Sequence, residues 1–138
     1  MAAELKQMIR TIQDQLIKLQ REKWDAVDRM DNPGFLELPI LNKDQEKINE
    51  NVKLIKAAMT SILKITAQQQ TKISQFKRIF SKLDLGEITR LLANETSICE
   101  DIINESSPVK ITKRIEELSN GITRTMGIIR GLIKSFST

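Results

Sequence analysis

The residue types that carry most acid–base and metal chemistry are scarce in this sequence. Among its 138 residues there is no His and no Tyr, and Cys99 is the one Cys. General acids and bases are therefore restricted to carboxylates and lysines, and a zinc site would lack its usual ligands. Cys99 lies on an apolar stripe without an imidazole to activate it, so it is predicted to be a buried thiol.

The carboxylates do not form an obvious catalytic pair either. Several of them stand near the predicted starts of helices, where a negative charge interacts favourably with the helix dipole. These residues are Glu4, Asp44, Glu46, Asp84 and Glu87. No glycine-rich phosphate-binding loop is present. The sequence therefore predicts a protein that is not an enzyme and that binds no cofactor or metal.

From residue 48 to residue 83, heptad-core positions recur at alternating spacings of four and three residues. A repeat of roughly 3.5 residues kept over about five heptads is typical of a coiled coil or a long bundle helix. All positions of this heptad stripe are apolar except Thr66 and Gln69. The stripe consists of Ile48, Val52, Ile55, Met59, Ile62, Thr66, Gln69, Ile73, Phe76, Phe80 and Leu83. It must be buried against other helices, so the sequence predicts helix assembly before any ligand.

Three other segments share this spacing, and breakers separate them. Helices are predicted over residues 2–30, 43–83, 85–104 and 108–136, with a connector over 31–42. Pro33 ends the first helix, Asn42 and Asp84 are predicted caps, and Pro108 suits the first position of the last helix. We expect one all-α domain over residues 1–138. It would be an elongated antiparallel helical bundle or coiled coil of about four helices with one long helix of ~40 residues. A single kinked helix spanning the second and third segments remains an alternative.

These stripes are expected to form helix–helix and oligomer interfaces. The predicted interface residues are Leu5, Ile9, Ile12, Leu16, Leu19, Ile55, Met59, Ile62, Gln69, Ile73, Phe76, Phe80, Ile115, Leu118, Ile122 and Ile129. Lys23 interrupts the first stripe, which predicts weaker or wetter packing there. Trp24 is expected to widen this stripe. A long helix of roughly 60 Å is expected to leave part of its stripe unpaired within one chain. The predicted partners are therefore proteins, in a homo-oligomer or a helical hetero-complex.

Polar residues within the long stripe are expected to control how the helices align. A buried amide penalises misaligned helices, because its hydrogen bonds would then go unmet. Thr66 and Gln69 are therefore predicted to fix the register. A lone Gln layer among apolar heptads also resembles the central layer of a membrane-fusion SNARE helix. That resemblance covers only the second helix and implies a vesicle-tethering module.

Charge is segregated along the chain. Every charged residue between Val52 and Leu83 is basic, whereas the next helix is mainly acidic. This predicts an antiparallel hairpin in which the two helices attract each other at their edges. The alternative is a nucleic-acid-associated protein that uses the basic face. The residues of that face are Lys72, Lys77, Arg78 and Lys82.

The C-terminal helix combines glycines with basic residues. Gly127 and Gly131 are spaced four residues apart, which predicts close approach of another helix. Arg124, Arg130 and Lys134 beside apolar residues also fit a peripheral membrane module that contacts the bilayer through this helix.

No targeting or membrane-spanning segment is expected. The N-terminus lacks a signal-peptide pattern, and no apolar run approaches the ~20 residues that a membrane span requires. With the lone Cys99, this predicts a cytoplasmic or nuclear location. The leading prediction is a non-enzymatic helical interaction and oligomerisation module, acting as a structural or scaffolding subunit of a larger assembly.

Overall fold

The computed structural model describes residues 3–135, and the side chains up to residue 132. In this range every regular element is a helix, which confirms the predicted all-α class. The helices are α1 (Ala3–Asp28), α2 (Glu37–Leu41), α3 (Gln45–Ile79), α4 (Gly86–Asn104) and α5 (Pro108–Ser135). The predicted helix ends at residues 2 and 136 lie outside the described residues. The short α2 falls within the segment predicted to be a connector.

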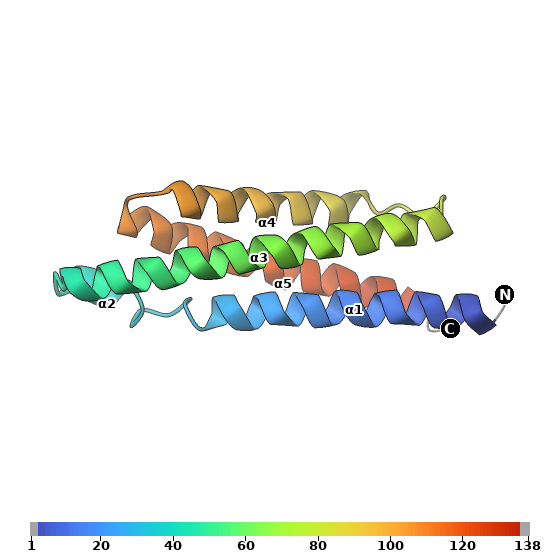
Figure 1. Ribbon diagram of the computed structural model, residues 1–138, viewed down its shortest axis with the longest axis horizontal. Coiled ribbons are helices and arrows are strands. Elements are labelled where there is room, and N and C mark those ends of the chain that lie inside the picture. Colours follow the sequence, from blue (N-terminus) through green and yellow to red (C-terminus); the bar gives the residue numbers. More distant parts are fainter. Residues whose placement is uncertain (1–2, 136–138) are drawn as a thin grey trace.

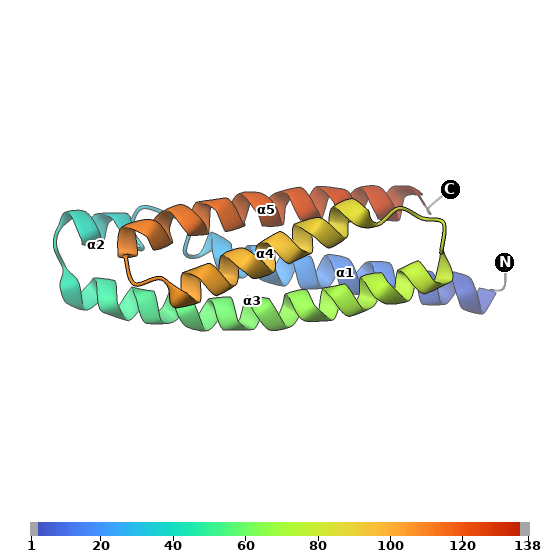
Figure 2. The ribbon, with the colours of Figure 1, turned by 90° about the horizontal axis from the view of Figure 1, so that it is seen from above.

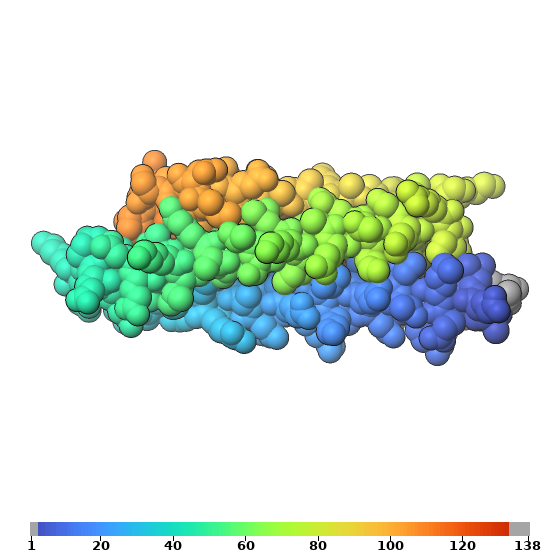
Figure 3. All heavy atoms as spheres, viewed as in Figure 1, coloured from blue at the N-terminus to red at the C-terminus, as the bar shows by residue number. Residues whose placement is uncertain are grey.

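The long helices lie side by side and form an elongated bundle (Figures 1 and 2). Successive long helices run in opposite directions along it, and the start of α1 lies at the same end as the end of α5 (Figure 1). α1 packs against α3 and α5, and α4 packs against the same two helices. α1 and α4 are therefore diagonal to each other across the core. The space-filling view shows α3 between α1 and α4, in contact with each of them along the rod (Figure 3).

The turn before α3 differs from the prediction. The cap of α3 is Asp44, whose carboxylate accepts a hydrogen bond from the Lys47 N–H at 3.2 Å. Asn42 was predicted in that role, but its N–H bonds back to Leu38 and closes α2. Lys43 then takes a positive φ of 55°, which turns the chain and brings Asp44 to the start of the next helix.

α3 ends at Ile79, four residues before the predicted end at Leu83, and the chain between Phe80 and Leu85 is not helical. α4 begins at Gly86, so α3 and α4 are separate helices rather than one kinked helix. The predicted cap Asp84 lies one residue before the N-cap position, which is Leu85, and its carboxylate accepts a hydrogen bond from the Gly86 N–H at 2.9 Å. The Ser107 hydroxyl accepts one from Lys110 at 3.4 Å, and Pro108 is the first residue of α5.

The core consists of two apolar clusters. The cluster nearer α2 includes Ile55, Met59 and Ile62 of α3, and the cluster nearer the start of α1 includes Ile73 and Phe76. The α3 stripe is buried within the single chain from Ile48 to Phe76 at nearly every heptad position. It was expected to remain partly unpaired, and this packing removes the argument from which self-association through the stripe was predicted. Between the two clusters lies a layer of polar side chains.

Candidate functional site: a buried polar layer and an exposed groove

The polar layer joins all four long helices in the middle of the core. Lys23 of α1 and Glu95 of α4 form an ion pair across the diagonal, with 2.9 Å between Nζ and Oε1. Both side chains are 0% exposed. The packing around Lys23 was expected to be weak or wet. Lys23 is instead fully buried, and Glu95 supplies the opposite charge in the core.

Two threonines complete this layer from the other two helices. The Lys23 ammonium donates to the Thr66 hydroxyl on α3 at 3.3 Å, and that hydroxyl donates to the Ile62 carbonyl at 2.8 Å. The Thr125 hydroxyl on α5 donates to Glu95 Oε2 at 2.8 Å. Each charged group therefore has a neutral partner as well as its counter-ion, which reduces the cost of burying both charges.

Two glutamines extend the layer by one turn. The Gln69 amide donates to Gln20 Oε1 at 2.7 Å, and the Gln20 amide donates to the Ile122 carbonyl at 2.8 Å. Both glutamines are fully buried. The Gln69 Oε1 atom has no hydrogen-bond partner among the described residues. The predicted polar position Gln69 is thus part of a network linking α1, α3 and α5.

Burial controls the protonation of two groups near the layer. Desolvation lowers the pKa of the Lys23 ammonium below its ordinary value of 10.5, and the Glu95 carboxylate opposes part of this shift. Desolvation, assisted by the Glu95 charge, raises the pKa of the Cys99 thiol from 9.0 to about 12. Cys99 is buried, as the sequence predicted, and its raised pKa keeps it in the unreactive thiol form.

A second feature lies on the surface, in a groove of about 630 Å³ between α1 and α5. Trp24 lines it and is 43% exposed, which is high for the one tryptophan of the chain. Met126 and Gly127 line it from α5. Arg21 and Arg130 contribute positive charge, and Asp25 is the one carboxylate among the lining residues. Indole rings that remain exposed in such grooves are common anchors at protein interfaces.

Most predicted interface residues lie inside the chain. The buried ones are Ile9, Ile12, Leu16, Ile55, Met59, Ile62, Gln69, Ile73, Phe76, Ile115, Leu118, Ile122 and Ile129. Leu5 and Phe80 are half-buried and pack against the cluster nearer the start of α1. Leu19 is also half-buried but belongs to neither apolar cluster, and Gln20 takes the fully buried position next to it. After Leu16, the next buried position on α1 is Gln20, four residues on, whereas Leu19, three residues on, was predicted.

The structure separates the predicted basic residues. Lys72 and Arg78 line a groove between α1 and α3. Lys77 donates to the Leu83 carbonyl, and Lys82 is exposed in the turn that follows α3. Arg124 lies 3.6 Å from Glu87 of α4, Arg130 lines the Trp24 groove, and the Lys134 side chain lies outside the described residues.

α3 and α4 pack against each other and run in opposite directions, as the predicted antiparallel hairpin requires (Figure 1). No ion pair joins these two helices among the described side chains; Glu95 pairs with α1, and Asp101 and Glu87 pair with α5. The close contact predicted at Gly127 and Gly131 is wrong within the chain, since a Cβ at either position would meet nothing within 4 Å.

No helix in the described part is both long and apolar enough to cross a membrane.

Residues that the sequence interpretation missed share one property: their role depends on a partner from another helix. Gln20, the hydrogen bond from Thr125 to Glu95 and the pairing of Lys23 with Glu95 belong to this group. A usable signal existed, because Lys23 and Glu95 were the charged residues that interrupted two apolar stripes. Trp24 was placed on the α1 stripe, but it lies outside the core.

Comparison with family models, curated proteins and solved structures gives no match for this chain.

Proposed function

We propose that this protein is a non-enzymatic helical interaction module, a structural subunit built as an antiparallel four-helix bundle. It would engage its protein partner through the α1–α5 surface rather than through its heptad stripes. The observation that carries the proposal is the exposure of Trp24, which is 43% exposed in a groove, whereas the heptad stripes are buried against other helices of the same chain.

The placement of the ionisable groups supports a role without catalysis. Lys23, Glu95 and Cys99 have strongly buried side chains, and none of them lines the grooves described above. A substrate would have to enter the core to reach them. The layer they form is better suited to fixing the alignment of the helices.

The position of α5 favours a protein partner over a membrane surface. Its apolar residues Ile122, Met126 and Ile129 are buried in the bundle. A helix that binds a bilayer surface needs an exposed apolar face beside its basic residues. With the apolar face of α5 buried, the exposed Trp24 beside Arg130 fits a polar protein surface better.

Site-specific photo-crosslinking in the organism that encodes the protein tests this proposal. A photoreactive benzoylphenylalanine at position 24 is expected to form adducts with a protein, identified by mass spectrometry. The matched control is the same residue at position 54, because Leu54 is 53% exposed on α3 and outside the groove. Adducts that are absent at position 24, or equally frequent at position 54, would contradict the proposal.

A further inference from the structure

One continuous stripe of residues on α5 faces solvent beside α1 and the connector. It consists of Thr112, Glu116, Asn120, Thr123, Gly127 and Arg130, spaced by four or three residues. The first three line a pocket of about 360 Å³ near α2, and the last three line the Trp24 groove. We call this set the α5 stripe.

The α5 stripe carries one acidic and one basic residue at equal distances on either side of its central residue, Thr123. Glu116 lies seven residues before Thr123, and Arg130 lies seven residues after it. Both side chains are exposed, and neither has an ion-pair partner among the described residues. If a second copy of the helix is placed antiparallel to the first with the two Thr123 residues opposite each other, Glu116 of each copy lies opposite Arg130 of the other. A two-fold axis at Thr123 therefore pairs opposite charges.

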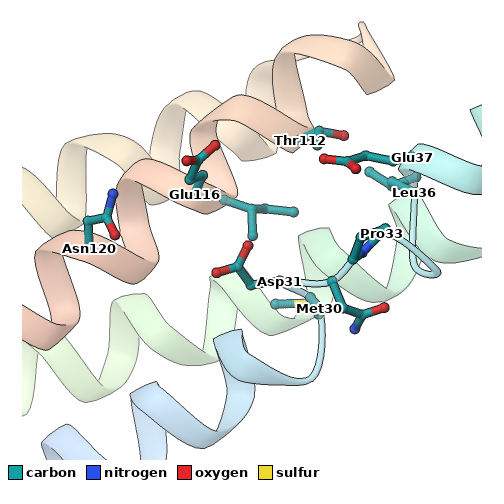
Figure 4. A pocket seen from close by; sticks show the side chains of 10 residues that line it. Met30, Asp31, Pro33, Leu36, Glu37, Thr112, Glu116 and Asn120 are labelled. Atoms are coloured by element: carbon teal, nitrogen blue, oxygen red, sulfur yellow. The ribbon is translucent and has the colours of Figure 1, made fainter.

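Residues outside α5 repeat this polarity. Asp31 and Glu37 surround the pocket near α2 together with Glu116, and no basic residue lines it (Figure 4). At the other end of the stripe, Arg21 stands with Arg130 in the Trp24 groove, beside the single carboxylate Asp25. The face thus has an acidic end and a mainly basic end.

We propose that two copies of this chain pack their α5 stripes antiparallel about a two-fold axis at Thr123. Glu116 of each copy then meets Arg130 of the other, and each Trp24 is covered by the second copy. Such an isologous contact buries the same face twice and closes without forming a filament. The inference rests on the proposed function and specifies its partner.

The middle of the α5 stripe suits a close helix–helix contact. Asn120, Thr123 and Gly127 are small, and the space above Gly127 is open. Glycine in a helix interior is destabilising relative to alanine, a cost that close packing by a second copy would offset. A face two helices wide and roughly 30 Å long offers about 600 Å² per copy, at the lower limit for a stable dimer. Dimerisation in the micromolar range is the expected strength.

Charge reversal with rescue tests the two-fold contact on the purified full-length chain. Light scattering and sedimentation across a concentration series are expected to show a dimer for the unchanged protein. Glu116→Arg or Arg130→Glu alone should weaken dimerisation at least ~10-fold. Mixing these two variants should restore a heterodimer, because both ion pairs then re-form across the interface. The double variant should restore the homodimer for the same reason.

A second pair of variants separates the contact from effects on folding. Gly127→Leu should fill the space above α5 and abolish the dimer without unfolding the bundle. Ala93→Leu, on the exposed face of α4, is the matched control and should leave the dimer intact. Trp24 fluorescence reports the contact directly, with a shift to shorter wavelength as the dimer forms.

A monomeric mass at every concentration, or a dimer that survives both charge reversals and Gly127→Leu, would overturn the inference. If crosslinks from position 24 then lead to a different protein, the proposed function stands and only the second copy is rejected. A Trp24 shift that appears only with vesicles of anionic lipid would reject the protein partner as well.

Discussion

The polar layer in the core and the α5 stripe on the surface use the same kinds of residue under opposite conditions. Lys23 and Glu95 are 0% exposed and meet each other across the diagonal of the bundle. Glu116 and Arg130 are exposed, lie on one helix, and have no ion-pair partner within the described chain. Water solvates the second set, so each of its charges is tolerated alone. The first set is tolerated only as a pair.

This difference assigns different tasks to the two regions. The apolar clusters on either side of the polar layer consist largely of Ile and Leu, which pack acceptably in more than one alignment. One alignment alone brings Lys23 opposite Glu95 while Gln69 meets Gln20. The layer therefore restricts how the helices align within the chain, and the stripe provides a surface on which a second molecule can align.

Removing one partner of the buried ion pair is expected to have the largest effect on stability. Glu95→Leu leaves the Lys23 charge alone in the core and should lower the free energy of unfolding by about 3–5 kcal/mol. Adding Lys23→Met should restore most of that stability, because no unpaired charge then remains. Urea denaturation followed by circular dichroism measures both. As a surface control, Glu116→Leu should change stability by less than about 0.5 kcal/mol.

Alkaline pH should act on the core and not on the stripe. The pKa of Cys99 is raised from 9.0 to about 12, so above pH 9 the folded chain retains a proton that the unfolded chain loses. The Cys99 contribution therefore decreases with pH, by an amount on the order of 2 kcal/mol at pH 10.5. The lowered pKa of Lys23 acts in the opposite direction, because the unfolded chain then holds the extra proton below pH 10.5.

Urea unfolding between pH 8 and pH 10.5 separates these two contributions. Cys99→Ala should flatten the decrease in stability. The Lys23→Met, Glu95→Leu double variant should steepen it, since the compensating rise is removed together with its counter-ion. Parallel curves for all three proteins would show that neither group is linked to folding as its burial requires.

The smallest expected effect comes from replacing glycines of α5 by alanine. Gly127→Ala should stabilise the bundle by about 0.5–1 kcal/mol, because the added Cβ meets nothing within 4 Å and alanine favours the helix. Gly121→Ala should gain at least as much, since its Cβ would make an ordinary van der Waals contact with the Glu95 side chain at 3.8 Å. Thermal unfolding at concentrations where the protein is monomeric measures the difference.

Local signals in the sequence were sufficient for the four long helices and for the approximate position of their ends, although the second helix was predicted to end at Leu83 and α3 ends at Ile79. Pro33, Asp84 and Pro108 punctuate the heptad spacing, and the structure places helix boundaries at or near each of them. The physical reason is that capping and the missing N–H of proline act within a few residues. Where capping had two adjacent candidates, as at Asn42 and Asp44, the choice depended on the positive φ of Lys43.

The candidate site was only partly accessible from the sequence. Thr66 and Gln69 were identified as polar members of the core, because they occupy heptad positions. Gln20 was missed, since the spacing of α1 allows either Leu19 or Gln20 on the buried side and hydropathy favours leucine. The exposure of Trp24 was missed because an aromatic residue on an amphipathic helix is expected in the core.

Residue spacing and breakers predict that the chain is helical, roughly where its long helices begin and end, and which faces of α3 and α5 are buried. These properties depend on spacing along one chain segment. Tertiary structure alone decided that Lys23 meets Glu95, that the α3 stripe is covered within one chain, and that Trp24 lies in an open groove. Each of these depends on which helices are neighbours and how they align, and a buried charge is stable only where another helix supplies its partner.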